Sequence, residues 1–132
     1  MYIGDYLARR ELYSPDNLGF IDAGKSPVWR LTFREANRRA NKLANWLKAQ
    51  GIRKGDRVAI VARDGYKHLD TFFACAKLGA IHMALNWRQN LHELFTIFES
   101  TRLKILIFSD CAAVLPVWRR AAPCSAGGEV HP

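Results

Sequence analysis

The sequence predicts an α/β fold built on a parallel sheet, and three observations support this prediction. Short apolar runs at 57–62, 80–85 and 104–108 alternate with two stretches of helical periodicity, 66–78 and 91–100. The first run is almost continuously apolar, which is typical of a strand buried on both faces. Strands that alternate with helices form βαβ units with right-handed crossovers. A chain of 132 residues with 49% hydrophobic positions fits one globular domain and excludes a disordered or fibrous protein.

A short helix and a hairpin precede this pattern. The helix is predicted over residues 3–12, and the turn-forming residues 14–17 follow it. Two apolar runs, 18–21 and 28–31, flank a second turn and predict an antiparallel pair of strands.

The most regular helix of the sequence starts at Thr32. Thr32 and Glu35 have the spacing of a capping box, in which each side chain accepts a hydrogen bond from the other residue's backbone. Apolar residues then recur every three or four positions up to Gly51, where a glycine suits the end of a helix. We expect the opposite face to be a solvated outer surface. It carries the five cations Arg34, Arg38, Arg39, Lys42 and Lys48.

The two later helices have boundary signals of their own. Gly79 ends the helix over 66–78, and Asn90 caps the helix that begins at Leu91. Cys75 lies between two alanines with no histidine paired to it in sequence, so we predict a core residue rather than a nucleophile.

The net charge of +8 raises the question of a nucleic-acid partner. The excess is local, because residues 30–57 hold nine basic and only two acidic side chains. No interleaved aromatic residues and no nucleic-acid motif accompany them. We therefore expect no nucleic-acid partner. The alternative is a small basic binding module without catalysis, for which nucleic acid is the candidate ligand.

Residues 19–26 match the phosphate-loop pattern G-x-x-x-x-G-K-[ST] literally. The motif binds phosphate where a strand leads into the loop and a helix follows it. Here the turn 14–17 precedes the match and an extended segment, 27–31, follows it. We predict a hairpin turn, and a phosphate-loop NTPase is the less favoured alternative.

Cysteine and histidine usage predicts a reduced protein without a metal site. Neither the odd number of cysteines nor the spacing of the histidines matches a ligand motif. These residues are Cys75, Cys111, Cys124, His68, His82, His92 and His131. The sequence shows no signal-peptide pattern and no apolar run near the roughly 20 residues of a membrane span. We expect a cytoplasmic protein without integral membrane association.

Five segments of the sequence follow one another in the order of a known family. They are 31–44, 51–60, 72–80 with its Lys-Leu-Gly-Ala ending, the Asn-x-Arg turn at Asn86 and Arg88, and Glu93-Leu94 together with 104–107. In this order they resemble the N-terminal part of the adenylate-forming (AMP-binding) acyl-CoA synthetase and ligase superfamily. The fold expected from the resemblance is a partial parallel-sheet βαβ domain preceded by a short helix and a hairpin.

The resemblance implies a two-step ligase reaction in the intact family enzyme. A carboxylic or fatty acid attacks the α-phosphate of ATP to give an acyl-adenylate and pyrophosphate, and the thiol of CoA then displaces AMP. Mg²⁺ offsets the phosphate charge. The resemblance also makes Asn86 and Arg88 candidates for a substrate loop. The other interpretation of these two residues is a purely structural turn.

The family's phosphate loop, adenine and ribose motifs and catalytic lysine match no segment of this sequence. We therefore expect no catalytic, cofactor-binding or metal-ligating residue in the chain, and no activity when it is alone. The missing remainder of the enzyme is the expected partner.

The resemblance divides the chain at residue 110. Residues 1–110 would be a partial N-terminal domain of an AMP-dependent synthetase or ligase, and residues 111–132 an irregular tail. The tail holds three prolines and does not resemble the family, which suggests a truncation or frameshift near residue 110. We also expect exposed apolar faces at Phe72, Phe73, Leu94 and Phe98.

Overall fold

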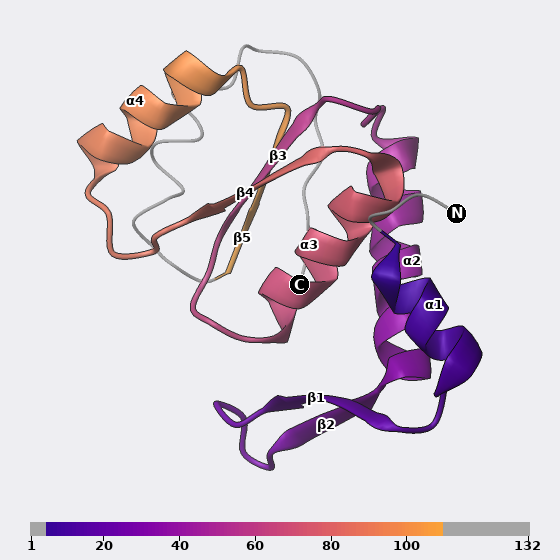
Figure 1. Cartoon of the computed structure of the whole chain (residues 1–132). Helices are drawn as coiled ribbons and strands as arrows, with labels where there is room; N and C mark the ends of the chain where they lie inside the picture. The colour runs from indigo at the N-terminus through magenta and orange to yellow at the C-terminus, as the bar shows by residue number, and fades with distance from the viewer. Residues whose placement is uncertain (1–4, 110–132) are drawn as a thin grey trace.

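The computed structural model describes residues 5–109, which form two small sheets and four helices (Figure 1). In chain order the elements are α1 (Tyr6–Tyr13), β1 (Leu18–Asp22), β2 (Trp29–Thr32), α2 (Phe33–Ala49), β3 (Arg57–Val61), α3 (Tyr66–Leu78), β4 (Ile81–Leu85), α4 (Leu91–Thr101) and β5 (Ile105–Phe108). The predicted order of helices and strands is confirmed over these residues. The tail 111–132, with Cys111, Cys124 and His131, lies outside the described residues.

The three-stranded sheet is parallel, with the order β4-β3-β5. Its central strand is β3, in which Val58 pairs with His82 on one side and with Ile105 on the other. Residues 58–61 are fully buried. The apolar run is therefore a strand covered on both faces, as its composition predicts.

Helices cover both faces of this sheet (Figure 1). On one face, Val58 and two residues of β5 pack with α2 and α3 in a cluster that includes Leu47 and Cys75. On the other face, Ala59 and Val61 pack with α4. Successive residues of a strand point to opposite faces, so one apolar run supplies both clusters.

The expectation that Leu94 and Phe98 of α4 are exposed is wrong. Leu94 is 1% exposed and Phe98 is 6% exposed, because α4 lays its apolar side on the second face of the sheet. Phe73 is half-buried against a third cluster formed by α1 and α2. Only Phe72, which is 50% exposed, fits the expectation fully.

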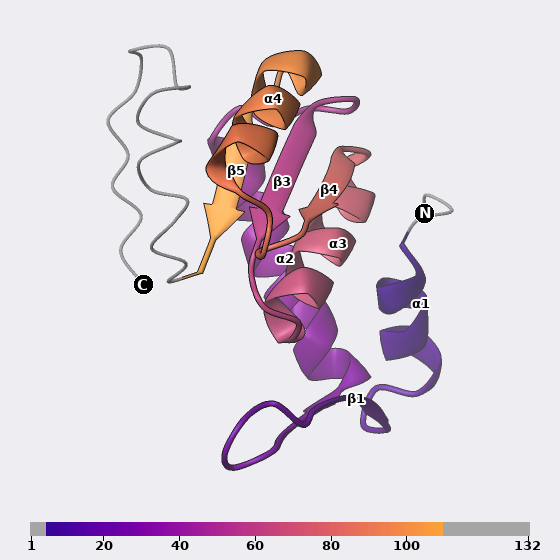
Figure 2. The ribbon, with the colours of Figure 1, turned by 90° about the vertical axis from the view of Figure 1, so that its left-hand side faces the viewer.

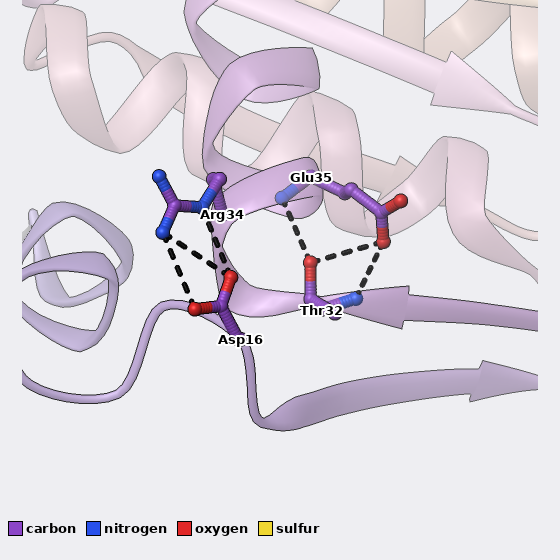
Figure 3. A network of polar contacts seen from close by, with 4 residues as sticks. All are labelled: Asp16, Thr32, Arg34 and Glu35. Carbon is purple, nitrogen blue, oxygen red and sulfur yellow. Dashed lines mark hydrogen bonds and ion pairs between the residues drawn. The ribbon is translucent and has the colours of Figure 1, made fainter.

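The hairpin β1–β2 lies at the start of α2, away from the parallel sheet (Figure 2). The capping box predicted at this junction is present. The backbone N–H of Thr32 donates to the Glu35 carboxylate at 2.8 Å, and the Thr32 hydroxyl accepts from the Glu35 N–H at 3.3 Å (Figure 3). Beside it, Arg34 forms an ion pair with Asp16 at 3.2 Å. The helix ends at Ala49, and Gly51 follows with a φ of +86°.

Arg39 departs from the predicted solvated face of α2. Its guanidinium donates to the Asp70 carboxylate, with the shortest distance 2.6 Å. It also lies 5.2 Å from the centre of the Trp29 ring and 4.7 Å from that of Tyr66. The hydrogen bond to Asp70 raises the pKa of Arg39. The hairpin and α3 both reach this side of α2, which periodicity along α2 alone does not indicate.

The side chain of His82, on β4, contacts Phe72 of α3. Its ring meets that of Phe72 edge to face at 5.7 Å, and its buried Nε2 has no hydrogen-bond partner among the described residues. Burial lowers the pKa of His82 from 6.5, and the charge of nearby His68 lowers it further. The neutral ring is therefore the form that the fold accommodates.

None of the helices in this part of the chain is long and apolar enough to cross a bilayer.

Replacing Arg39 by Lys is expected to lower the free energy of unfolding by about 1–2 kcal/mol, because Lys keeps the charge but loses the two-pronged bond and the ring stacking. The matched control is Arg38→Lys, which changes an exposed arginine one position away and is expected to have little effect. Urea unfolding followed by circular dichroism measures both. Equal effects of the two variants would contradict this account of Arg39.

The burial of His82 is expected to make the stability of the fold depend on pH. Its folded-state pKa lies below the unfolded value, so its neutral form contributes fully above pH 6.5 and stability falls as the pH drops below that value. His82→Gln is expected to flatten the decline between about pH 7 and pH 5. The exposed His92 provides the control variant His92→Gln, which is expected to retain the decline. A parental slope in His82→Gln would contradict the assignment.

Candidate functional site

A polar hollow of about 460 Å³ opens where β3 and β4 end. Parallel strands end at the same edge of a sheet, so the loops after β3 and after β4 meet there. We call it the edge hollow. Its lining residues are Ala62, Asp64, His68, Ala84, Leu85, Asn86, Trp87 and Arg88. The structure thus brings the two predicted site residues, Asn86 and Arg88, into one depression.

Asn86 shapes the loop that follows β4. Its side-chain oxygen accepts a hydrogen bond from the backbone N–H of Arg88 at 3.0 Å, and its carbonyl oxygen accepts one from Gln89 at 3.1 Å. These two bonds close a tight turn of the kind that asparagine favours. The carboxamide oxygen of Asn86 is engaged by the turn, and a direct contact with substrate stays a prediction.

Two arginines lie on the same tryptophan at this edge. The guanidinium carbon of Arg88 is 4.8 Å from the centre of the Trp87 ring, and that of Arg63 is 4.9 Å from it. Neither guanidinium forms an ion pair with a carboxylate of residues 5–109. These distances are those of cation–π contacts, which attract a guanidinium to the face of an indole ring.

Sequence analysis missed Trp87 as a lining residue of the edge hollow, and it missed Arg63, which lies beside Trp87. A signal existed, because Arg63 stands two positions after β3 and Trp87 two positions after β4. Positions just after neighbouring parallel strands meet at one edge.

His68 and Asp64 complete the polar lining. The Nε2 atom of His68 lies 3.0 Å from the carbonyl oxygen of Ala62. A carbonyl can only accept, so Nε2 carries the hydrogen, and in the neutral ring Nδ1 is left as an acceptor. Asp64 adds a carboxylate to the same hollow. The edge hollow is therefore suited to binding a polar group, and it brings together no nucleophile and base.

Other side chains with chemical potential are held away from this site. Cys75 is fully buried, and burial raises the pKa of its thiol to about 11, which keeps it protonated. This agrees with the predicted core role. Within residues 5–109, no three His, Cys, Asp or Glu side chains come together as a metal site would require.

The phosphate-loop match forms a hairpin, as predicted. Residues 18–22 belong to β1 and residues 29–32 to β2, so a strand rather than a helix follows the loop. Asp22 accepts hydrogen bonds from Gly24 at 3.1 Å and from Tyr66 at 3.2 Å. The ammonium group of Lys25 lies 5.4 Å from the centre of the Tyr66 ring. These residues join the hairpin to α3.

A second hollow, of about 670 Å³, lies at the opposite end, next to the C-termini of α2 and α3. Its cations are Lys48, Arg53, Lys54 and Lys77. Basic side chains at helix C-termini interact favourably with the helix dipole, which accounts for their position. Lys77 is also ion-paired with Asp5 at 2.7 Å. Ion pairs likewise engage two of the five cations of α2.

Comparison with known proteins places this geometry in a family. The family model described as AMP-binding enzyme matches residues 13–127. Feruloyl-CoA synthase of an Amycolatopsis species is 35% identical over 105 residues, which are 80% of this chain and 21% of that protein. Long-chain-fatty-acid–CoA ligase FadD13 of Mycobacterium tuberculosis is 32% identical over 111 residues, 84% of this chain and 22% of that protein.

Solved structures give the same result. A fatty acyl CoA synthetase of M. tuberculosis superposes with a TM-score of 0.80 at 32% identity, covering 90% of this chain and 23% of that one. The N-terminal domain of FACL13 from the same organism superposes with a TM-score of 0.80 at 31% identity, covering 94% of this chain and 30% of that one. The chain thus spans about a fifth of the length of the curated relatives it matches. Its sequence and its fold both show that the chain belongs to the family of AMP-binding enzymes.

Proposed function

We propose that this chain forms part of the N-terminal domain of an AMP-forming acid–thiol ligase. The observation that carries the proposal is the superposition of nine-tenths of the chain on a fatty acyl CoA synthetase at 32% identity. Such an enzyme uses ATP to convert a carboxylic acid into an acyl-adenylate and then transfers the acyl group to CoA. The relatives' names include feruloyl and long-chain fatty acyl groups, which supports a carboxylic acid, with a fatty acid as the favoured class.

In this proposal the chain supplies a framework and one edge of the site rather than the reacting groups. The edge hollow contributes polar side chains, and Asn86 and Arg88 are its substrate-loop candidates. ATP, Mg²⁺ and CoA belong to the reaction of the whole enzyme. We assign no step of the reaction to Mg²⁺ through residues 5–109.

We propose that residues 1–110 form a partial N-terminal domain and that residues 111–132 form a separate tail. The family match itself runs on to residue 127. We also propose that the intact enzyme acts in the cytoplasm, because the three cysteines, an odd number without ligand spacing, indicate a reduced protein.

Fragment complementation tests the proposal. The chain alone is expected to show no carboxylate-dependent exchange of pyrophosphate into ATP, because it brings no catalytic group to the edge hollow. The chain mixed with FadD13 from which the matching segment has been removed is expected to restore exchange. The same segment taken from FadD13 serves as the positive control, and an Ile60→Asp variant, which places a charge in the buried strand, serves as the negative control.

Robust exchange by the chain alone would contradict the proposed division of roles. Restoration by the FadD13 segment but not by this chain would contradict the proposal that it belongs to such a ligase. In the restored enzyme, Asn86→Asp keeps an oxygen for the turn. Loss of exchange in that variant would support a substrate role, and normal exchange would leave Asn86 as a turn residue only.

A further inference from the structure

We propose that the hollow next to the C-termini of α2 and α3 binds a small anion made of linked phosphate groups. We call it the basic hollow, after its four cations, Lys48, Arg53, Lys54 and Lys77. It lies beside the loops that lead into β3 and β4, at the other end of the sheet from the edge hollow. The proposal goes beyond the ligase function and does not rest on it, because it concerns binding by this chain alone.

The first argument is the charge of the basic hollow. Four cations line it, and no carboxylate of residues 5–109 does. The ammonium nitrogen of Lys77 lies 2.7 Å from a carboxylate oxygen of Asp5, which offsets one of these charges. The C-terminus of each of the two helices contributes about half a negative charge. The helix dipoles thus favour cations here, but an excess of about two positive charges remains.

The second argument is that the described residues leave most of these cations without a partner. Lys48, Arg53 and Lys54 form no ion pair with a carboxylate of residues 5–109. The nearby carboxylate of Asp56 is ion-paired with Lys104 at 2.8 Å and accepts the backbone N–H of Arg53 at 2.7 Å. The carbonyls of residues 46–48 and 75–76 accept backbone N–H groups from the residues that follow the helices. The ammonium groups of Lys48 and Lys54 are therefore available to a ligand.

The third argument is that the backbone holds these cations together. The N–H of Gly55 donates to the carbonyl of Gly79 at 2.9 Å, which joins the loop after α2 to the end of α3. The stem of Lys54 packs on the same glycine, where an added Cβ would lie 3.1 Å from the Lys54 Cγ. A ligand that meets groups already held in place loses less of its binding free energy to ordering them.

The size and charge of the basic hollow indicate the chemical class of the ligand. A volume of about 670 Å³ lies within the usual range of small-molecule sites. Lysine binds phosphate as a point charge. Several ammonium groups around one hollow match an anion with several negative charges better than a single carboxylate. These features favour two or three linked phosphate groups.

Isothermal titration calorimetry at low salt tests the proposal, with the 132-residue chain and inorganic tripolyphosphate as the probe. Lys48→Gln and Lys54→Gln are each expected to weaken binding about tenfold, because each removes a charge-assisted hydrogen bond. The matched controls are Arg38→Gln and Lys42→Gln. They remove the same charge from exposed positions of α2 that do not line the basic hollow, and are expected to have little effect. Circular dichroism confirms the fold of each variant.

Two further comparisons sharpen the result. Asp5→Asn keeps an oxygen to cap α1 but removes the charge opposite Lys77, so it is expected to strengthen binding. Inorganic phosphate, with fewer charges, is expected to bind more weakly than tripolyphosphate.

Three results would overturn the proposal. The first is that tripolyphosphate does not bind at millimolar concentration. The second is that the control variants weaken binding as much as Lys48→Gln and Lys54→Gln do, which would show attraction to the net charge of the chain rather than a site. The third is equal affinity for inorganic phosphate, which would rule out a site for linked phosphate groups.

Discussion

The fold depends on one strand, β3, being buried from both sides. Residues 58–61 have no exposed surface, and alternate side chains enter the two clusters on opposite faces of the sheet. This arrangement requires α2 and α3 on one face and α4 on the other, because residues 58–61 are apolar on both faces of the sheet and neither face could be left to water at low cost. Parallel pairing on both sides of β3 then places the loops after β3 and β4 together. The edge hollow is a consequence of this burial.

A second constraint joins the hairpin to this framework. The N-terminus of α3 has Gly65 as its cap residue and no cap from its own side chain, and the carboxylate of Asp22 in β1 accepts the N–H of Tyr66 instead. Gly65 has a φ of +155°, and a Cβ there would lie 2.9 Å from the Asp22 oxygen. A glycine is required by both the conformation and the close approach. Together with the Arg39–Asp70 pair, this contact holds three elements at one point.

Much of this could be predicted from the sequence, because local signals determined it. The predicted capping box at Thr32, the cap at Asn90 and the helix end at Gly79 are all present in the structure. The prediction that Leu94 is exposed was wrong, and so was the prediction that Arg39 lies on a solvated face. Periodicity identifies which face of a helix is apolar, whereas the element that covers this face comes from distant parts of the chain. The stacking of Arg63 and Arg88 on Trp87 depends on two loops meeting, which a single apolar run does not reveal.

Native-state hydrogen exchange tests most directly the central role of β3. The amides of residues 58–61 are expected to exchange more slowly than those of the hairpin β1–β2, at rates that match global unfolding, because β3 opens only when both clusters separate. The hairpin, whose Ile21 and Trp29 are partly exposed, is expected to open at lower free energy. Hairpin protection equal to or greater than that of β3 would contradict the account.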